Sequence, residues 1–197
     1  MVATAHRRAT YQDVLDSPPN MVAEIINGEL HLQPRPTIPH ALASSALGEE
    51  LGPPFRRGRG GPGGWILMDE PELHLGGDIV VPDLAGWRRE RVPSITADTA
   101  YMEIAPDWVC EVLSAGTVKR DRTSKMDLYH RENVPWLWFI DPLAHIQEVF
   151  ERASRGWNLL GSFADNARVR AQPFEAIELD ISVMWADVSQ ADDTTCP

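Results

Sequence analysis

The pattern of apolar and polar residues predicts a strand, a helix and a second strand across residues 106–141. The first strand is the apolar run 108–113, which contains one acid, Glu111. A turn of small residues follows it, and the polar stretch from about 119 to 133 has the character of a helix. The second strand is the apolar run 136–140. This order is typical of the βαβ unit, which builds parallel sheets with functional sites at strand ends.

Earlier in the chain, the same patterns predict a hairpin and two helices. Residues 21–26 and 29–33 alternate around Asn27-Gly28, and this dipeptide is the strongest short-range signal for a hairpin. A short helix is expected at residues 11–15. The apolar spacing between His40 and about Leu51 predicts a longer, amphipathic helix.

Further apolar runs predict additional strands and a second, late hairpin. These strands are expected at 65–68, 72–75, 79–87, 146–150 and 157–160. The strand at 79–87 carries an acid, Asp83, directly after Pro82. A short helical turn at 183–186 is expected to end the fold.

Length and composition favour one globular domain, residues 1–186, followed by a disordered tail, residues 187–197. The chain has 197 residues, of which 43% are hydrophobic and 24% charged, as is ordinary for a globular protein. No apolar run approaches the length of about 20 residues that spans a bilayer, and the N-terminus lacks the apolar segment of a secretory signal. The two cysteines, Cys110 and Cys196, form no motif, so a cytoplasmic location is expected.

The formal net charge of −11 comes from 18 Lys and Arg against 29 Asp and Glu. This balance argues against a protein that coats nucleic acid non-specifically, because such binding depends on neutralising phosphates. It does not exclude a nuclease that holds metal ions on carboxylates. Local basic clusters could contact phosphate or could be solvated surface charge; they lie at 6–8, 56–59, 88–91 and 119–122.

Three residues suggest chemistry. Glu111 lies inside an apolar strand, where an unpaired carboxylate is costly, so it should be paired, protonated or bound to metal. Together with Asp83 it could hold Mg²⁺, which prefers oxygen ligands and activates water. Lys125, on the following helix, could stabilise developing negative charge. The alternatives are an ordinary strand-end acid at Asp83 and a surface ion pair between Lys125 and Asp121.

Several short stretches, in order and spacing, match one known family. They are Glu-Ile-Ile-Asn-Gly-Glu-Leu at 24–30, His40, Val-Pro-Asp-Leu at 81–84, Ala-Pro-Asp-Trp-Val-Cys-Glu-Val-Leu-Ser at 105–114, Asp121, Lys125, Tyr129 and Trp-Leu-Trp-Phe-Ile-Asp-Pro at 136–142. Over roughly residues 10–186 the chain resembles the Uma-two family of restriction endonucleases, a branch of the PD-(D/E)xK nuclease superfamily.

The resemblance implies an α/β, restriction-endonuclease-like core, in which helices flank a mixed central sheet and a β-hairpin lies at the N-terminus. It also implies Mg²⁺-dependent (or Mn²⁺-dependent) hydrolysis of DNA, with Asp83 and Glu111 as catalytic metal ligands and Glu24 as a further carboxylate. The usual lysine of the superfamily would fall at Leu113, which cannot do its work. The resemblance implies that in this branch the lysine is moved to the following helix, here Lys125.

The alternative class of function is a DNA-binding or regulatory protein that has this fold but is catalytically inactive. Leu113 and the acidic charge favour that alternative, and a metal-dependent hydrolase of another phosphoester is a third. A homodimer is the default for an enzyme that cuts both strands. His40 could cap or pack, and Tyr129 could simply pack. As a residue on a helix surface, Lys125 would contribute little stability, within about 0.5 kcal/mol.

Overall fold

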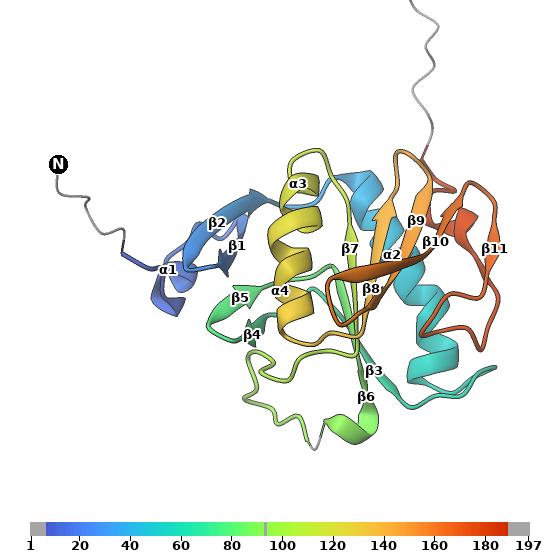
Figure 1. Cartoon of the computed structure of the whole chain (residues 1–197), viewed down its shortest axis with the longest axis horizontal. Helices are drawn as coiled ribbons and strands as arrows, with labels where there is room; N and C mark the ends of the chain where they lie inside the picture. Colours follow the sequence, from blue (N-terminus) through green and yellow to red (C-terminus); the bar gives the residue numbers. More distant parts are fainter. Residues whose placement is uncertain (1–6, 93, 189–197) are drawn as a thin grey trace, which may run out of the picture.

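The computed structural model describes residues 7–92 and 94–188. A six-stranded sheet with the order β10-β9-β8-β7-β6-β3 forms its centre (Figure 1). Its strands are β3 (Trp65–Asp69), β6 (Leu84–Arg88), β7 (Trp108–Val112), β8 (Trp136–Asp141), β9 (Ile146–Arg152) and β10 (Trp157–Ala164). Neighbouring strands are antiparallel except β7 and β8, which pair in parallel. The mixed sheet and its parallel pair confirm the fold class expected from the sequence.

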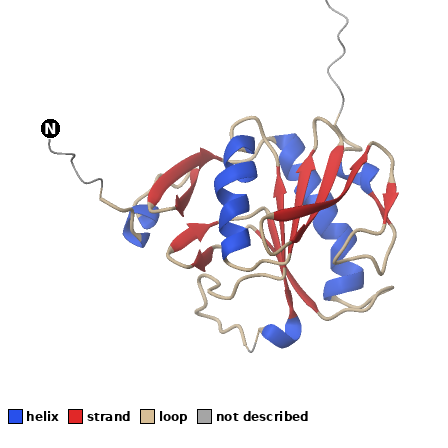
Figure 2. Ribbon diagram, in the orientation of Figure 1, coloured by secondary structure: helices blue, strands red, loops and turns tan. Residues whose placement is uncertain are grey.

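Helices cover both faces of this sheet, as Figures 1 and 2 show. One face packs against α2 (Ile38–Leu51), whose inward residues include Leu47 and Leu51. The other face packs against a continuous helical stretch made of α3 (Val118–Arg120), the π-helical turn η3 (Asp121–Lys125) and α4 (Met126–Arg131). Side chains of β7 alternate between these layers: Trp108, Cys110 and Val112 face α2, whereas Val109 faces α4.

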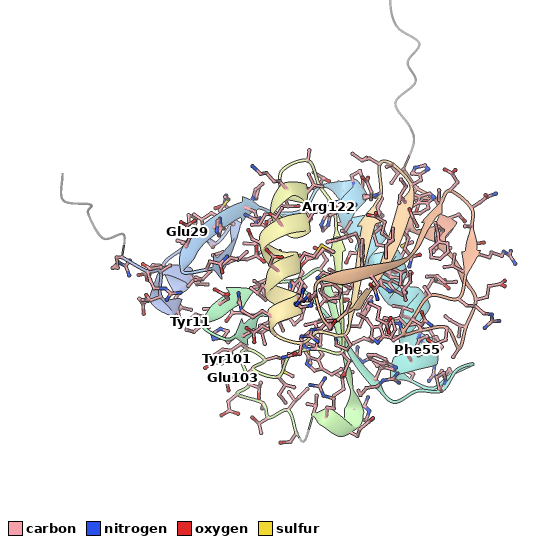
Figure 3. All side chains as sticks on the ribbon, viewed as in Figure 1. Tyr11, Glu29, Phe55, Tyr101, Glu103 and Arg122 are labelled. Atoms are coloured by element: carbon pink, nitrogen blue, oxygen red, sulfur yellow. The ribbon has the colours of Figure 1, made fainter. Side chains whose placement is uncertain are left out.

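A smaller four-stranded sheet carries the N-terminal hairpin, with the order β2-β1-β5-β4. It consists of β1 (Met21–Ile26), β2 (Glu29–Pro34), β4 (Leu73–Leu75) and β5 (Asp78–Val80), and α1 (Tyr11–Leu15) precedes it. The hairpin confirms the sequence prediction, because Asn27 and Gly28 both have positive φ, 56° and 82°, as a tight two-residue turn requires. Figure 3 shows Tyr11 and Tyr101 near this sheet, where their rings meet edge to face.

One strand prediction was wrong in a way that matters for the site. The run 79–87 is two strands rather than one: β5 belongs to the small sheet and β6 to the central sheet. The chain crosses between the sheets at Val81-Pro82-Asp83, where Pro82 has no N–H to donate to a strand ladder. Asp83 therefore lies in the connection, at the point where the two sheets meet.

The C-terminal part adds elements that the sequence patterns did not reveal. The late hairpin, β9 and β10, is longer than predicted, and β11 (Arg168–Val169) pairs with β12 (Leu179–Asp180). The last helical turn, η4 (Ile181–Met184), begins two residues before the expected position. Two further helical turns lie earlier in the chain, η1 (Gly52–Arg56) and η2 (Arg89–Arg91). Most of the predicted tail, 189–197, lies outside the described residues.

In the part of the chain that the structure describes, no helix is both long enough and apolar enough to cross a membrane.

Candidate active site

The candidate site lies at the carboxyl end of β7, where the small sheet and the α3–α4 stretch meet the central sheet. Glu24 comes from β1, Glu111 from β7 and Lys125 from η3. All three are buried, with exposed fractions of 0%, 3% and 1%. Side chains that are far apart in the sequence thus form one enclosed cluster of charges.

Lys125 holds this cluster together. Its Nζ lies 2.9 Å from Glu111 Oε1 and 3.0 Å from Glu24 Oε1, and Asp121 Oδ1 is 3.9 Å away. Burial lowers the pKa of an ammonium, but the negative charges of Glu111, Glu24 and Asp121 outweigh burial and raise the pKa of Lys125 above its usual 10.5. The lysine is therefore charged at neutral pH, and it is not the exposed helix residue that the sequence suggested.

Glu111 has a second partner on the same helical stretch. The hydroxyl of Tyr129 donates a hydrogen bond to Glu111 Oε1 at 2.5 Å, and Tyr129 is fully buried. Burial raises the pKa of the Glu111 carboxyl well above 4.5, and the charge of Lys125 opposes that rise. Neighbouring carboxylates raise it further; they are Asp121, Asp83 and Glu24.

Glu24 is fixed mainly by the backbone of the strand crossing. Its Oε1 accepts a hydrogen bond from Val81 N at 3.0 Å, and its Oε2 lies 3.7 Å from Arg120 Nε. The hairpin thus contributes an acid to the cluster at the point where the chain leaves the small sheet.

Asp83 is held by different groups. Its Oδ2 accepts a hydrogen bond from Val112 N at 2.6 Å, so the carboxylate takes the place of a strand partner at the end of β7. Its Oδ1 lies 3.2 Å from Nε2 of His40, which comes from α2. Burial lowers the pKa of His40, but the hydrogen bond and charge of Asp83 outweigh burial and raise that pKa above 6.5.

A cavity of about 290 Å³ opens beside this cluster. Asp83 and His40 line it, together with the loop 114–117 and residues of the hairpin. Glu111 and Lys125 lie behind these residues and do not line the cavity. Among Glu24, Asp83 and Glu111, Asp83 is therefore the acid that a ligand in the cavity would meet.

The donor set suits a hard divalent cation. Glu24, Asp83 and Glu111 offer only carboxylate oxygens, the ligands that Mg²⁺ prefers. With Asp121, four carboxyl groups lie near the two cations Lys125 and Arg120. Within residues 7–92 and 94–188, no three His, Cys, Asp or Glu side chains are arranged as a ready-made metal site. Lys125 and Tyr129 occupy the oxygens of Glu111.

Leu113, at the usual position of the superfamily lysine, is not part of this cluster. It is 5% exposed and belongs to the apolar core under α4, with Val109 and Leu128. A lysine at this position would need to place its charge among apolar side chains, whereas Lys125 reaches Glu111 from the helix.

Sequence reasoning underestimated Asp121, Tyr129 and Arg120. Asp121, Lys125 and Tyr129 are spaced by four residues, and this spacing places side chains on one face of a helix. That signal was present in the sequence. The involvement of Arg120 had no such signal, because it depends on the hairpin lying next to α3.

The sequence matches the family model described as "Putative restriction endonuclease", named Uma2, over residues 8–183. The chain belongs to the Uma2 family. Among solved structures, the Uma2 chain is similar to the crystal structure of a putative nuclease of the DUF820 group from Anabaena variabilis ATCC 29413. The TM-score is 0.69 and the identity 20%, with coverage of 90% of this chain and 98% of the other. At that identity the likeness shows a shared fold. A search of curated proteins found no match.

Proposed function

We propose that this Uma2 protein is an Mg²⁺-dependent or Mn²⁺-dependent endonuclease that hydrolyses DNA. Asp83 and Glu111 are the metal ligands, Lys125 is the catalytic lysine and Glu24 is a supporting carboxylate. One observation carries the proposal: Lys125 Nζ lies within 3.0 Å of both Glu111 and Glu24 inside a buried cluster. A cation on the helix thus reaches the strand acid, although Leu113 leaves the usual lysine position apolar.

Each residue of the candidate site has its own role in this proposal. His40 and the N–H of Val112 fix the orientation of Asp83, and Tyr129 fixes that of Glu111. The charge of Lys125 opposes the rise in the pKa of Glu111 that burial causes, and its ammonium can stabilise negative charge that develops on a phosphate. The bound metal would polarise the phosphate and lower the pKa of a water molecule.

The test is cleavage of supercoiled plasmid by purified protein with Mg²⁺ or Mn²⁺, in parallel with Asp83→Asn. We expect nicking by the wild type and none by the variant. Absence of cleavage by the wild type on plasmid, linear duplex and single-stranded DNA would refute the proposal.

A second candidate function is a DNA-binding or regulatory protein that keeps the fold without catalysis. Two observations favour it: the oxygens of Glu111 are occupied by Lys125 and Tyr129, and Glu111 does not line the cavity. Calorimetry with Mn²⁺ distinguishes the two candidate functions. The nuclease requires that Mn²⁺ binds to the wild type and that Asp83→Asn removes this binding, whereas the binding or regulatory protein does not. The homodimer and the cytoplasmic location remain predictions. Light scattering, which measures the mass of the particle in solution, tests the homodimer.

A further inference from the structure

The residues that line the cavity beside the acids are of two kinds. Arg35, Arg120 and Thr117 are basic or polar. Val22, Leu32 and Val81 are apolar. A ligand that satisfies both kinds carries an anionic group and, next to it, an apolar or planar group.

The two arginines are available to an anion. The side chain of Arg35 is 61% exposed, and its ion pair with Glu70 is long, at 3.8 Å. Arg120 lines the cavity and donates to Gln33; its buried Nε makes no hydrogen bond but lies 3.7 Å from Glu24 Oε2. A guanidinium carries five N–H donors and recognises phosphate in a bidentate way, so each arginine has donors left for a phosphate.

The apolar part of the lining includes an exposed side chain, because Leu32 lies on the edge strand β2 and is 41% exposed. Gly116, on the loop after β7, also lines the cavity, and a Cβ placed there would meet no atom within 4 Å. The space next to Gly116 is therefore open to a ligand.

The size of the cavity limits what it can hold. Small-molecule sites usually measure about 300–1,000 Å³, and this cavity, at about 290 Å³, lies at the lower end of that range. A cavity of this size suits a single nucleotide. It is too small for a base pair, which consists of two nucleotides held side by side. The acids Asp83 and Glu70 also line it, and they are opposed by Arg35, Arg120 and, when protonated, His40.

We propose that this cavity binds one unpaired nucleotide of a DNA strand. The phosphate lies against Arg35 and Arg120, and the sugar and base lie against Val22, Leu32 and Val81. The inference rests on the proposed nuclease function and narrows its substrate to DNA with unpaired nucleotides, which occur at single-stranded ends, gaps and flaps and in locally unwound parts of a supercoiled plasmid.

The first experiment measures binding of 5′-dTMP and of inorganic phosphate to the full chain in EDTA, by calorimetry or NMR. We expect 5′-dTMP to bind about tenfold more tightly than phosphate, because it also removes apolar surface from water. Leu32→Ser should weaken 5′-dTMP about tenfold and leave phosphate unchanged, whereas Arg35→Gln should weaken both. Gly116→Leu, which fills the open space, should abolish 5′-dTMP binding.

Arg168→Gln is the matched control. The side chain of Arg168 is 68% exposed, so it resembles Arg35 in exposure, and its ion pairs with Glu178 and Asp180 are both long, at 3.7 Å. It lies on β11 and does not line the cavity. We expect wild-type binding from this variant. Equal affinity for 5′-dTMP and phosphate, or equal loss in Arg35→Gln and Arg168→Gln, would overturn the proposal.

The second experiment compares DNA with a single-stranded overhang and blunt duplex of equal length, by fluorescence anisotropy in EDTA. Tighter binding of the overhang, lost in Leu32→Ser, supports an unpaired nucleotide of a strand. Equal binding of both DNAs, or binding of free 5′-dTMP without binding of the overhang, overturns it. If the overhang binds but no DNA is ever cut, the cavity assignment stands and the nuclease function fails.

Discussion

The acids of the candidate site fall into two halves that are held in opposite ways. In the buried half, Glu24 and Glu111 are enclosed with Lys125, and their contacts are to charged side chains and to Tyr129 and Val81 N. In the cavity half, Asp83 is 14% exposed and binds a backbone N–H and His40. In the buried half one lysine is shared between two enclosed acids, and the cavity half presents an oriented carboxylate to solvent.

This difference separates stability from ligand access. A buried ion pair is strongly destabilised when one partner is removed, because the other charge is left without compensation. A partly exposed carboxylate can be solvated by water after the same kind of change. Substitutions in the buried half should therefore affect folding and chemistry together, and those in the cavity half should affect chemistry alone.

The largest effect is expected from Lys125→Met. It removes the one cation that Glu24 and Glu111 share, so the free energy of unfolding at pH 7 should fall by about 3–5 kcal/mol. The difference from wild type should narrow at lower pH, where the orphaned acids are protonated. Urea denaturation at several pH values measures this. Lys119→Met, on the exposed side of α3, is the control and should change stability by less than about 0.5 kcal/mol. Similar stability of both variants would show that Lys125 does not bind the acids.

Tyr129→Phe should have the next largest effect. It removes a hydrogen bond to a buried carboxylate without changing the packed ring, at a cost of about 1.5–3 kcal/mol. Metal-dependent cleavage should also fall, because Glu111 loses one of the groups that orient it. The thermal unfolding midpoint and the cleavage rate are the two measurements. A variant with wild-type stability would mean that the hydrogen bond contributes nothing.

Glu111→Gln should change the pH dependence of stability and also abolish activity. Because the pKa of Glu111 is raised in the folded state, the folded chain binds this proton more tightly than the unfolded chain does. Its contribution to stability is therefore present below about pH 4.5 and is lost as pH rises toward the folded pKa. Glu111→Gln cannot lose this proton, so its stability should decline less between pH 5 and 8 than that of wild type. Its cleavage should be abolished. An identical pH slope in both proteins would contradict the raised pKa.

The smallest change in stability is expected in the cavity half. Asp83→Asn keeps the shape of the side chain and a carbonyl oxygen for Val112 N, so stability should change by less than about 1 kcal/mol. Binding of Mn²⁺, measured by calorimetry, should nevertheless be lost. If Asp83→Asn destabilised the protein as much as Lys125→Met, this result would contradict the proposed difference between the two halves.

Local signals in the sequence determined much of the fold. Asn27-Gly28 set the hairpin, because few other residues adopt two successive positive φ angles. The two apolar runs on either side of a polar helix set the parallel pair β7–β8. Glu111 was identified as a candidate because an acid inside an apolar strand requires a partner. The helical spacing of Asp121, Lys125 and Tyr129 indicated the members of that cluster that lie on the helix.

Only the tertiary structure decided which groups meet. The division of residues 79–87 between two sheets was hidden, because an apolar run looks the same whether or not the chain changes sheets within it. That crossing places Val81 N against Glu24 and Asp83 against Val112 N. The burial of Lys125 and the contact of His40 with Asp83 likewise join elements distant in the sequence. The electrostatics of such contacts depend on distance and burial in space, and no local pattern of residues encodes them.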